Sequence, residues 1–393
     1  MNSLPMVRAR GFSVVELMVS VVIGLLALMF ATRLMTGAES NKQAALGGSD
    51  SMQNGMQAMF SISADAAQAG YGLNDQIIAG CNTVFGDNEG YELASATMGT
   101  ATVTPLAAAV IEPNGSNPDR LTLYAGSSLS GTGTLRVTAA YSGGTTINVD
   151  RRPYGFAKGD VIVVAPDAPR GTCALAQISA DPATAGPPPA QQFIQIAAAD
   201  DLRFNRGALG ASFGGSTSRL FNLGPAAGLA FHTWSVADGF LRLRATDMEG
   251  AASDPATVAD NIVSIQAQYG FDTRPDATFR GDTSARVVQW SDTMINADGL
   301  GVAGDAGDYQ RIAALRIAVV ARSKSPERAA PGATCTATTA LPQVFATAEP
   351  AGVEAVPVTV NVGVTGDSVD WRCYRYRVFE TIVPLRNAGW RPT

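Results

Sequence analysis

Three residues near the amino terminus have types and spacing that could support chemistry. Gly11 is followed directly by Phe12, and Glu16 lies four residues further on. A cut between Gly11 and Phe12 would create a positive amine about one helical turn from the Glu16 carboxylate. In an apolar environment an unpaired charge is strongly disfavoured, so this amine could pair with the Glu16 carboxylate of a neighbouring chain.

These residues stand at the start of an apolar run. Residues 12–31 are almost entirely apolar apart from Glu16, and Arg8 and Arg10 precede them. About 20 apolar residues cross a bilayer as a helix, and a central carboxylate costs about 2.5 to 3.5 kcal/mol on insertion scales. Because the arginines come first, we predict a cytoplasmic amino terminus and export of everything after Arg33. No small-residue cleavage site of the secretory type follows the apolar run.

The junction resembles the class III signal of type IV prepilins and pseudopilins. In that superfamily a peptidase cuts after the glycine, the new first residue is N-methylated, and the glutamate is kept for assembly. The resemblance implies that Gly11 is the cleavage residue of a leader spanning residues 1–11. It implies that Phe12 is the methylated first residue and Glu16 the assembly carboxylate. The alternative is a plain single-pass anchor with a stray glutamate.

The rest of the sequence offers little for catalysis. The only histidine, His232, lies in an expected hairpin, and no GxSxG nucleophile motif accompanies it. A phosphate-binding GxxxxGK[ST] loop is also missing from the sequence. We therefore interpret His232 as a structural, half-exposed residue, and we expect neither enzyme activity nor a cofactor.

One glycine-rich loop carries several oxygen ligands. The stretch NADGLGVAGDAGD contains Asn296, Asp298, Asp305 and Asp308. Such a loop could bind calcium, as in some pseudopilins, but it lacks the spacing and the closing glutamate of an EF-hand. We favour a solvated, flexible loop without metal, and calcium binding stays open as the alternative.

Four cysteines lie in the part expected to be exported, where disulfides can form. They are Cys81, Cys173, Cys335 and Cys373, and their wide spacing does not suit a zinc site. Three pairings are open. We prefer Cys81–Cys173 with Cys335–Cys373, because each pair closes a shorter loop.

Length and charge limit the classes of function. The 393 residues suffice for an anchor plus one large or two small domains, and we favour a single domain over residues 73–393. The formal charge is −6, and it becomes −8 if the leader with Arg8 and Arg10 is removed. An acidic chain of this kind is a poor candidate for direct binding of nucleic acid.

The amino-terminal helix is expected to continue beyond the membrane, through residues 12–72. Gly70 and Gly72 would end it, and residues 12–69 would form a helix about 87 Å long. Apolar residues recur at helical spacing in its second half. They are Met52, Met56, Met59 and Phe60, followed by Ser63 and Ala67. We favour packing of this methionine stripe under the globular part, with a partner surface as the alternative.

Short β-like segments separated by turn residues follow from Asn74. Phe231 to Arg244 predicts a hairpin with Asp238-Gly239 as its turn. Residues 262–271 and 314–322 alternate, which predicts antiparallel sheets with one wet face carrying polar residues such as Arg316. We interpret Arg372, Arg375 and Arg377 as charges that protect an edge strand, with an edge that binds an acidic partner as the alternative. Four shorter candidates are Leu121–Ala125, Thr134–Ala140, Val161–Ala165 and Phe193–Ala197. The expected fold is α+β: a long, pilin-like transmembrane helix followed by a β-rich antiparallel domain.

Three carboxy-terminal stretches narrow the resemblance. DNIVSIQAQYGFDT, ALRIAVVARS and YRYRVFETIVPLRNAGW are similar to the carboxy-terminal half of the PilW family of minor type IV pilins. The resemblance implies a protein held in the bacterial inner membrane with a periplasmic domain, which then enters the cell-surface pilus. Residues 74–255 resemble nothing we can name, so their fold is inferred by continuity only.

The implied role is assembly, in which a minor pilin primes or caps the fibre. The implied partners are other minor pilins, the major pilin, the prepilin peptidase and the inner-membrane assembly platform, with a large tip adhesin as a further candidate. Two alternatives stay open. One is a minor pseudopilin of a type II secretion system, and the other is a membrane-tethered periplasmic binding module or enzyme.

Overall fold

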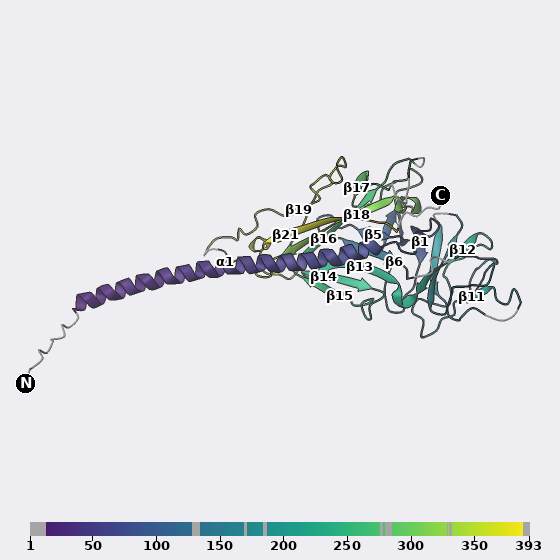
Figure 1. Cartoon of the computed structure of the whole chain (residues 1–393), viewed down its shortest axis with the longest axis horizontal. Helices are drawn as coiled ribbons and strands as arrows, with labels where there is room; N and C mark the ends of the chain where they lie inside the picture. Colours follow the sequence, from purple (N-terminus) through teal and green to yellow (C-terminus); the bar gives the residue numbers. More distant parts are fainter. Residues whose placement is uncertain are drawn as a thin grey trace, which may run out of the picture.

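The structure is a computed structural model dominated at its amino terminus by one long helix. It describes residues 13–127, 134–168, 171–183, 187–275, 278–279, 285–327, 329 and 332–387, and of residues 36–47 it describes the backbone only. Helix α1 (Val14–Gln68) has 55 residues. Its first half projects away from the globular part, and its second half lies along it (Figure 1). The helix ends before Gly70 and Gly72, which both have positive φ.

Two antiparallel sheets contact the second half of α1. The strand orders are β15-β14-β13-β6-β5 and β17-β16-β18-β21. The first sheet comprises β5 (Ala109–Glu112), β6 (Arg120–Ala125), β13 (Ala230–Ala237), β14 (Phe240–Ala245) and β15 (Ala256–Asp260). The second comprises β16 (Ile262–Phe271), β17 (Gln289–Ser291), β18 (Ile312–Arg322) and β21 (Tyr376–Pro384).

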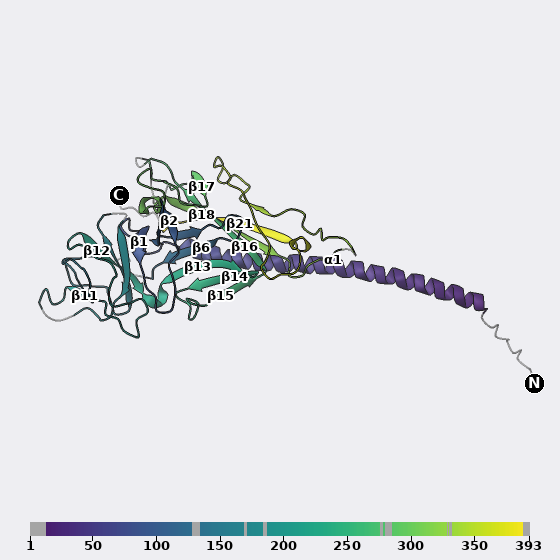
Figure 2. The same ribbon diagram turned by 180° about the vertical axis from the view of Figure 1, so that it is seen from behind.

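A six-stranded sheet lies beyond the carboxy-terminal end of α1, at the far end of the molecule from the amino terminus (Figure 2). Its order is β4-β1-β10-β9-β12-β7. Its strands are β1 (Cys81–Val84), β4 (Pro105–Leu106), β7 (Thr134–Arg136), β9 (Asp160–Pro166), β10 (Thr172–Gln177) and β12 (Ser218–Pro225). The pair β1–β10 is parallel, so the expectation of antiparallel pairing throughout is wrong at this point.

Small elements complete the described part of the fold. Three two-stranded sheets pair β2 (Ala96–Met98) with β3 (Ala101–Val103), β8 (Thr146–Asn148) with β11 (Phe193–Gln195), and β19 (Gln343–Val344) with β20 (Val358–Thr359). The short helical turns are η1 (Ala226–Gly228), α2 (Ala306–Tyr309) and η2 (Trp371–Cys373).

Most local strand predictions match an element of the structure. The expected hairpin is β13–β14, and its turn residues Asp238 and Gly239 both have positive φ, as a two-residue turn of type I′ requires. Two segments are shorter than predicted. Of the predicted strand 134–140 only Thr134–Arg136 forms a strand, and of 193–197 only Phe193–Gln195.

One continuous hydrophobic core joins helix α1 to the four-stranded sheet and to the six-stranded sheet. Ala58 and Ile62 of α1 belong to the same buried cluster as Ile317 of β18 and Phe221 of β12. A second cluster covers the other face of the six-stranded sheet, where Ile162 and Val164 pack with Ile147 and Ile194.

The prediction of a wet face on β16 and β18 is wrong. All ten residues of β16 are buried, and so is Arg316 of β18. The reason is that the β19–β20 segment covers this face of the sheet and packs Phe345 and Val360 against Val320. The alternating pattern of β16 and β18 gives no sign of this distant segment. Buried Arg316 has protein partners in place of water. Arg316 Nη2 lies 3.0 Å from Glu380 Oε2, and its Nη1 donates to the carbonyl of Thr347.

Candidate functional site

The first candidate site is the exposed apolar part of α1. Val14–Met35 is long and apolar enough to cross a membrane, and none of it is buried in the structure. Glu16 lies in the first turn of the helix and is exposed. Gly11 and Phe12 lie outside the described residues, so cleavage and methylation stay predictions.

The second half of α1 packs through a different face from the one expected. The buried positions carry mostly small side chains: Ser51, Gly55, Ala58, Ile62, Ala66 and Ala69. Met52, Met56 and Phe60 are 44%, 55% and 76% exposed. The prediction that the methionine stripe packs under the globular part is therefore wrong for these three residues, whereas Met59 is partly buried against the core. Met52, Met56 and Phe60 form an open surface on one flank of the helix.

The small residues allow the helix to approach the sheet closely. A Cβ atom on Gly55 would lie 2.0 Å from Cε2 of Phe379 in β21. Glycine removes that clash, so the ring of Phe379 fills the space above the helix backbone. Because the helix backbone lies so close to the sheet, the bulkier methionines do not fit at this contact and lie on the flank of the helix.

A polar cluster ties the end of α1 to the sheet. His232 Nδ1 in β13 lies 2.8 Å from Asp65 Oδ2 of α1, and His232 Nε2 lies 2.7 Å from Asp247 Oδ1. The indole N–H of Trp234 donates to the same Asp65 oxygen at 2.8 Å. One helix carboxylate thus accepts hydrogen bonds from two residues of one strand.

The charge state of this cluster follows from its geometry. Burial lowers the pKa of His232, but the hydrogen bonds to Asp247 and Asp65 outweigh burial and raise the pKa to about 9. Burial raises the pKa of Asp247, and the hydrogen bond from His232 more than offsets it, so this pKa is lowered. At neutral pH the imidazolium therefore lies between two carboxylates. His232 makes a structural contact, but its side chain is only 13% exposed, so the expectation of a half-exposed residue is wrong. No nucleophile hydrogen-bonds its ring in the described residues.

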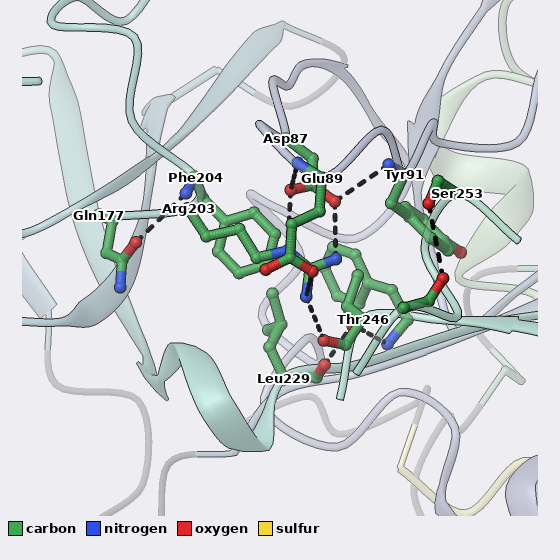
Figure 3. Close-up of polar contacts among 11 residues, drawn as sticks. Asp87, Glu89, Tyr91, Gln177, Arg203, Phe204, Leu229, Thr246 and Ser253 are labelled. Atoms are coloured by element: carbon green, nitrogen blue, oxygen red, sulfur yellow. Dashed lines mark hydrogen bonds and ion pairs between the residues drawn. The ribbon is translucent and has the colours of Figure 1, made fainter. Parts of the chain in front are cut away.

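A second polar cluster joins the loop after β1 to the end of β14 (Figure 3). Arg203 Nε and Nη2 lie 2.8 and 2.7 Å from the two carboxylate oxygens of Asp87, whose side chain is fully buried. Arg203 Nη1 lies 2.9 Å from Glu89 Oε2 and donates to the carbonyl of Thr246. Asp87 also accepts the backbone N–H groups of Glu89 and Tyr91. Its hydrogen-bonding capacity is filled from within the chain, as expected for a structural ion pair.

The acidic loop is more ordered than predicted. Carboxylate oxygens of Asp298, Asp305 and Asp308 lie within 4.8 Å of one another, and Asp305 and Asp308 are buried. The expectation of a solvated loop is therefore wrong for these two. Asp308 accepts backbone N–H groups of Ala297, Asp298 and Gly304, while burial raises its pKa to about 6. These bonds explain the arrangement without an ion, and calcium binding stays an untested alternative.

The four cysteines form two disulfides, Cys81–Cys173 and Cys335–Cys373. This is the pairing preferred from the sequence. The first joins β1 to β10 within the six-stranded sheet, and the second joins the segment before β19 to η2, just ahead of β21.

Comparison with known proteins identifies the carboxy-terminal part of the chain. Residues 233–387 match the family model described as Type IV Pilus-assembly protein W, PilW. These residues are thus similar to the PilW family. No curated protein and no solved structure matches the chain. The chain is accordingly a protein related to type IV pilus assembly, and the family implies interaction with components of that machinery.

The PilW-family region is not a separate unit in the fold. It begins inside β13 and ends just after β21, so it supplies β13–β15 and the whole second sheet. The edge strand β5 and its neighbour β6 in the first sheet come from outside it, as does Asp65 of α1. The matched region is thus completed by the helix and by strands from outside residues 233–387.

Sequence reasoning missed the partners in both polar clusters. Asp65 and His232 are 167 residues apart, and Asp87 and Arg203 are 116 apart. No local motif marks either pair. The sequence did draw attention to His232, because it is the only histidine, but it did not indicate the partners of that residue.

Proposed function

We propose that this chain is a non-catalytic minor type IV pilin that helps to prime or cap the pilus fibre. On this proposal it is anchored in the inner membrane with its globular part in the periplasm, and prepilin peptidase cuts it between Gly11 and Phe12. Its partners are the other minor pilins, the major pilin and the inner-membrane assembly platform, with a large tip adhesin as a further candidate. The match of residues 233–387 to PilW supports the pilus machine over the alternatives.

The observation that carries the proposal is Glu16 on an otherwise apolar, unburied helix. A carboxylate is unfavourable in hydrocarbon, so a single inserted chain gains nothing from it. After cleavage, the amine of Phe12 in one subunit can pair with Glu16 of its neighbour. Such a pair satisfies both charges and favours one axial register between helices. The carboxylate therefore has a use in an assembly and none in an isolated anchor.

The rest of the helix supports the same conclusion. No residue from Val14 to Met35 is buried in the fold, so their apolar surface is available to lipid first and to neighbouring helices later. The globular part is fastened to α1 by the small-residue face and by the cluster around His232.

Glu16→Ala tests the proposal. The variant should insert into the membrane at least as well as the wild type, because a costly group has been removed. It should still be processed to Phe12, because the scissile bond is unchanged, and intact mass shows whether it is. It should be missing from sheared pili and fail to restore piliation to a deletion strain.

Ser20→Ala is the matched control. The Ser20 hydroxyl donates to the carbonyl of Leu17 within the same helix, so its loss should leave incorporation unchanged. If Glu16→Ala enters pili at the wild-type level, the carboxylate is not the assembly group and the proposed mechanism is wrong.

A further inference from the structure

The edge strand β21 has an open backbone. The backbone N–H of Leu385 donates to Ala313, and that of Ser323 donates to Arg375, so the odd-numbered residues of β21 face β18. The even-numbered residues 376, 378, 380 and 382 direct their backbone groups away from the sheet. Among the described residues, none of these four N–H groups has a hydrogen-bond partner.

The edge is also partly exposed, and it carries two exposed charged residues, Arg377 and Glu380. Val378 is 38% exposed, whereas the paired strand β18 is buried along nearly its whole length. Open edges of this kind attract other strands, and proteins usually protect them with charges, prolines or a cover. Here Arg377 and the terminal Pro384 protect the edge. The six residues between them include one further charge, Glu380, which pairs with Arg316.

The methionine stripe of α1 lies on the same side as this edge. Arg377 Nη1 contacts the sulfur of Met52 at 3.7 Å, and Phe379 packs over Gly55. Asn387, just after the strand, donates to the carbonyl of Gln68. Strand β21 therefore runs in the same direction as the second half of α1 and lies beside it (Figure 1), and the exposed Met52 contacts the strand through Arg377.

We propose that β21 accepts an added β-strand, an extended segment of a different protein chain. Main-chain hydrogen bonds to residues 376–382 would hold it, and alternate side chains would pack against Met52 and Met56. Arg377 makes no ion pair within the described residues, so a carboxylate on the added segment would complement it. The inference rests on the proposed pilus function, because it assigns the added strand to a component of the same assembly.

A second copy of this chain does not fit the edge. Two β21 strands that paired antiparallel around a twofold axis would point their α1 helices in opposite directions, because β21 is parallel to α1. Both apolar segments could not then enter the same membrane from the same side. Antiparallel pairing of two copies is therefore disfavoured, and we take a chain of different sequence as the occupant.

Photo-crosslinking in piliated cells tests the inference on the full chain. A photo-crosslinking amino acid in place of Met56 should capture one other protein, and the captured peptide should be an extended segment of it. Val378→Pro removes one outward N–H and leaves the ladder to β18 intact, because proline is tolerated on the open side of an edge strand. Losing that hydrogen bond should lower the crosslinking yield about tenfold. Val378→Ala, which keeps the N–H, should crosslink like the wild type.

Several results would overturn the inference. They are an unchanged yield with Val378→Pro, capture of a second copy of this chain, or capture of a helical segment alone. If Val378→Pro lowers the melting temperature, Arg377→Glu is used instead. Its charge can be reversed without breaking an ion pair among the described residues, and the crosslinking yield should again fall. A chain that crosslinks as expected but never enters sheared pili would contradict the pilus function and still support strand addition.

Discussion

His232 Nδ1 lies 2.8 Å from Asp65 Oδ2, and this contact joins strand β13 to the last turns of helix α1 across 167 residues of sequence. Asp247 holds the other ring nitrogen at 2.7 Å. The only histidine of the chain thus fastens the helix to the sheet while it is protonated. That arrangement makes the attachment of the helix dependent on pH.

We predict that the fold loses stability as the pH rises from 7 towards 10. The pKa of His232 is raised from 6.5 to about 9, so its contribution is fully present below pH 6.5 and is lost as the pH rises through 9. The shift corresponds to about 3 kcal/mol as an order of magnitude. Unfolding of the detergent-solubilised full chain, followed by circular dichroism across this range, measures it.

His232→Gln is the control for this prediction. It cannot carry a positive charge, so the difference in unfolding free energy between it and the wild type should shrink steadily between pH 7 and 10. A difference that stays constant over that range would show that the imidazolium does not stabilise the contact.

Gly55→Ala should destabilise the protein, although alanine is normally the better helix former. The gain of about 1 kcal/mol in helix propensity should be outweighed by overpacking against Phe379, which costs about 1 to 3 kcal/mol. Gly48→Ala is the matched control in the same helix, because its Cβ would meet nothing closer than 3.7 Å. We expect a lower melting temperature for Gly55→Ala and an equal or higher one for Gly48→Ala.

The clash can be isolated by removing the ring. In a Phe379→Leu background, adding Gly55→Ala should become neutral or stabilising. If Gly55→Ala destabilises equally in both backgrounds, contact with Phe379 is not the reason for glycine at this position.

Arg203→Met should strongly destabilise the fold. It leaves the fully buried carboxylate of Asp87 without its counter-charge, a change that typically costs about 3 to 5 kcal/mol. Arg219→Met is the control: Arg219 also pairs with an aspartate at 2.7 Å, but it is 39% exposed, so its loss should cost less than about 1 kcal/mol. Chemical denaturation of the three proteins compares them.

The double variant Asp87→Asn/Arg203→Met extends the test. Neutralising the buried acid should recover part of the stability lost in Arg203→Met. Additive losses would mean that the two side chains do not act as a pair.

Local sequence determined the features of this protein that depend on residues close together. The apolar run of α1, its end near Gly70, and the Asp238-Gly239 turn of the β13–β14 hairpin all follow from neighbouring residues. Hydrophobic periodicity, helix-stop signals and backbone preferences act over a few residues, so they can be read without knowing the fold.

Tertiary structure alone decided which faces were buried. Helix α1 has two faces that could pack, the methionine stripe and the small residues around Gly55. The small-residue face packs against the sheet because it allows the close approach of Phe379. The polar residues of β16 and β18 became buried because a distant segment around Phe345 covers them. The partners of His232 and Arg203 likewise come from remote parts of the chain. Side-chain pattern indicates which residues can be buried, but the shape and cover supplied by remote segments determine which of them are.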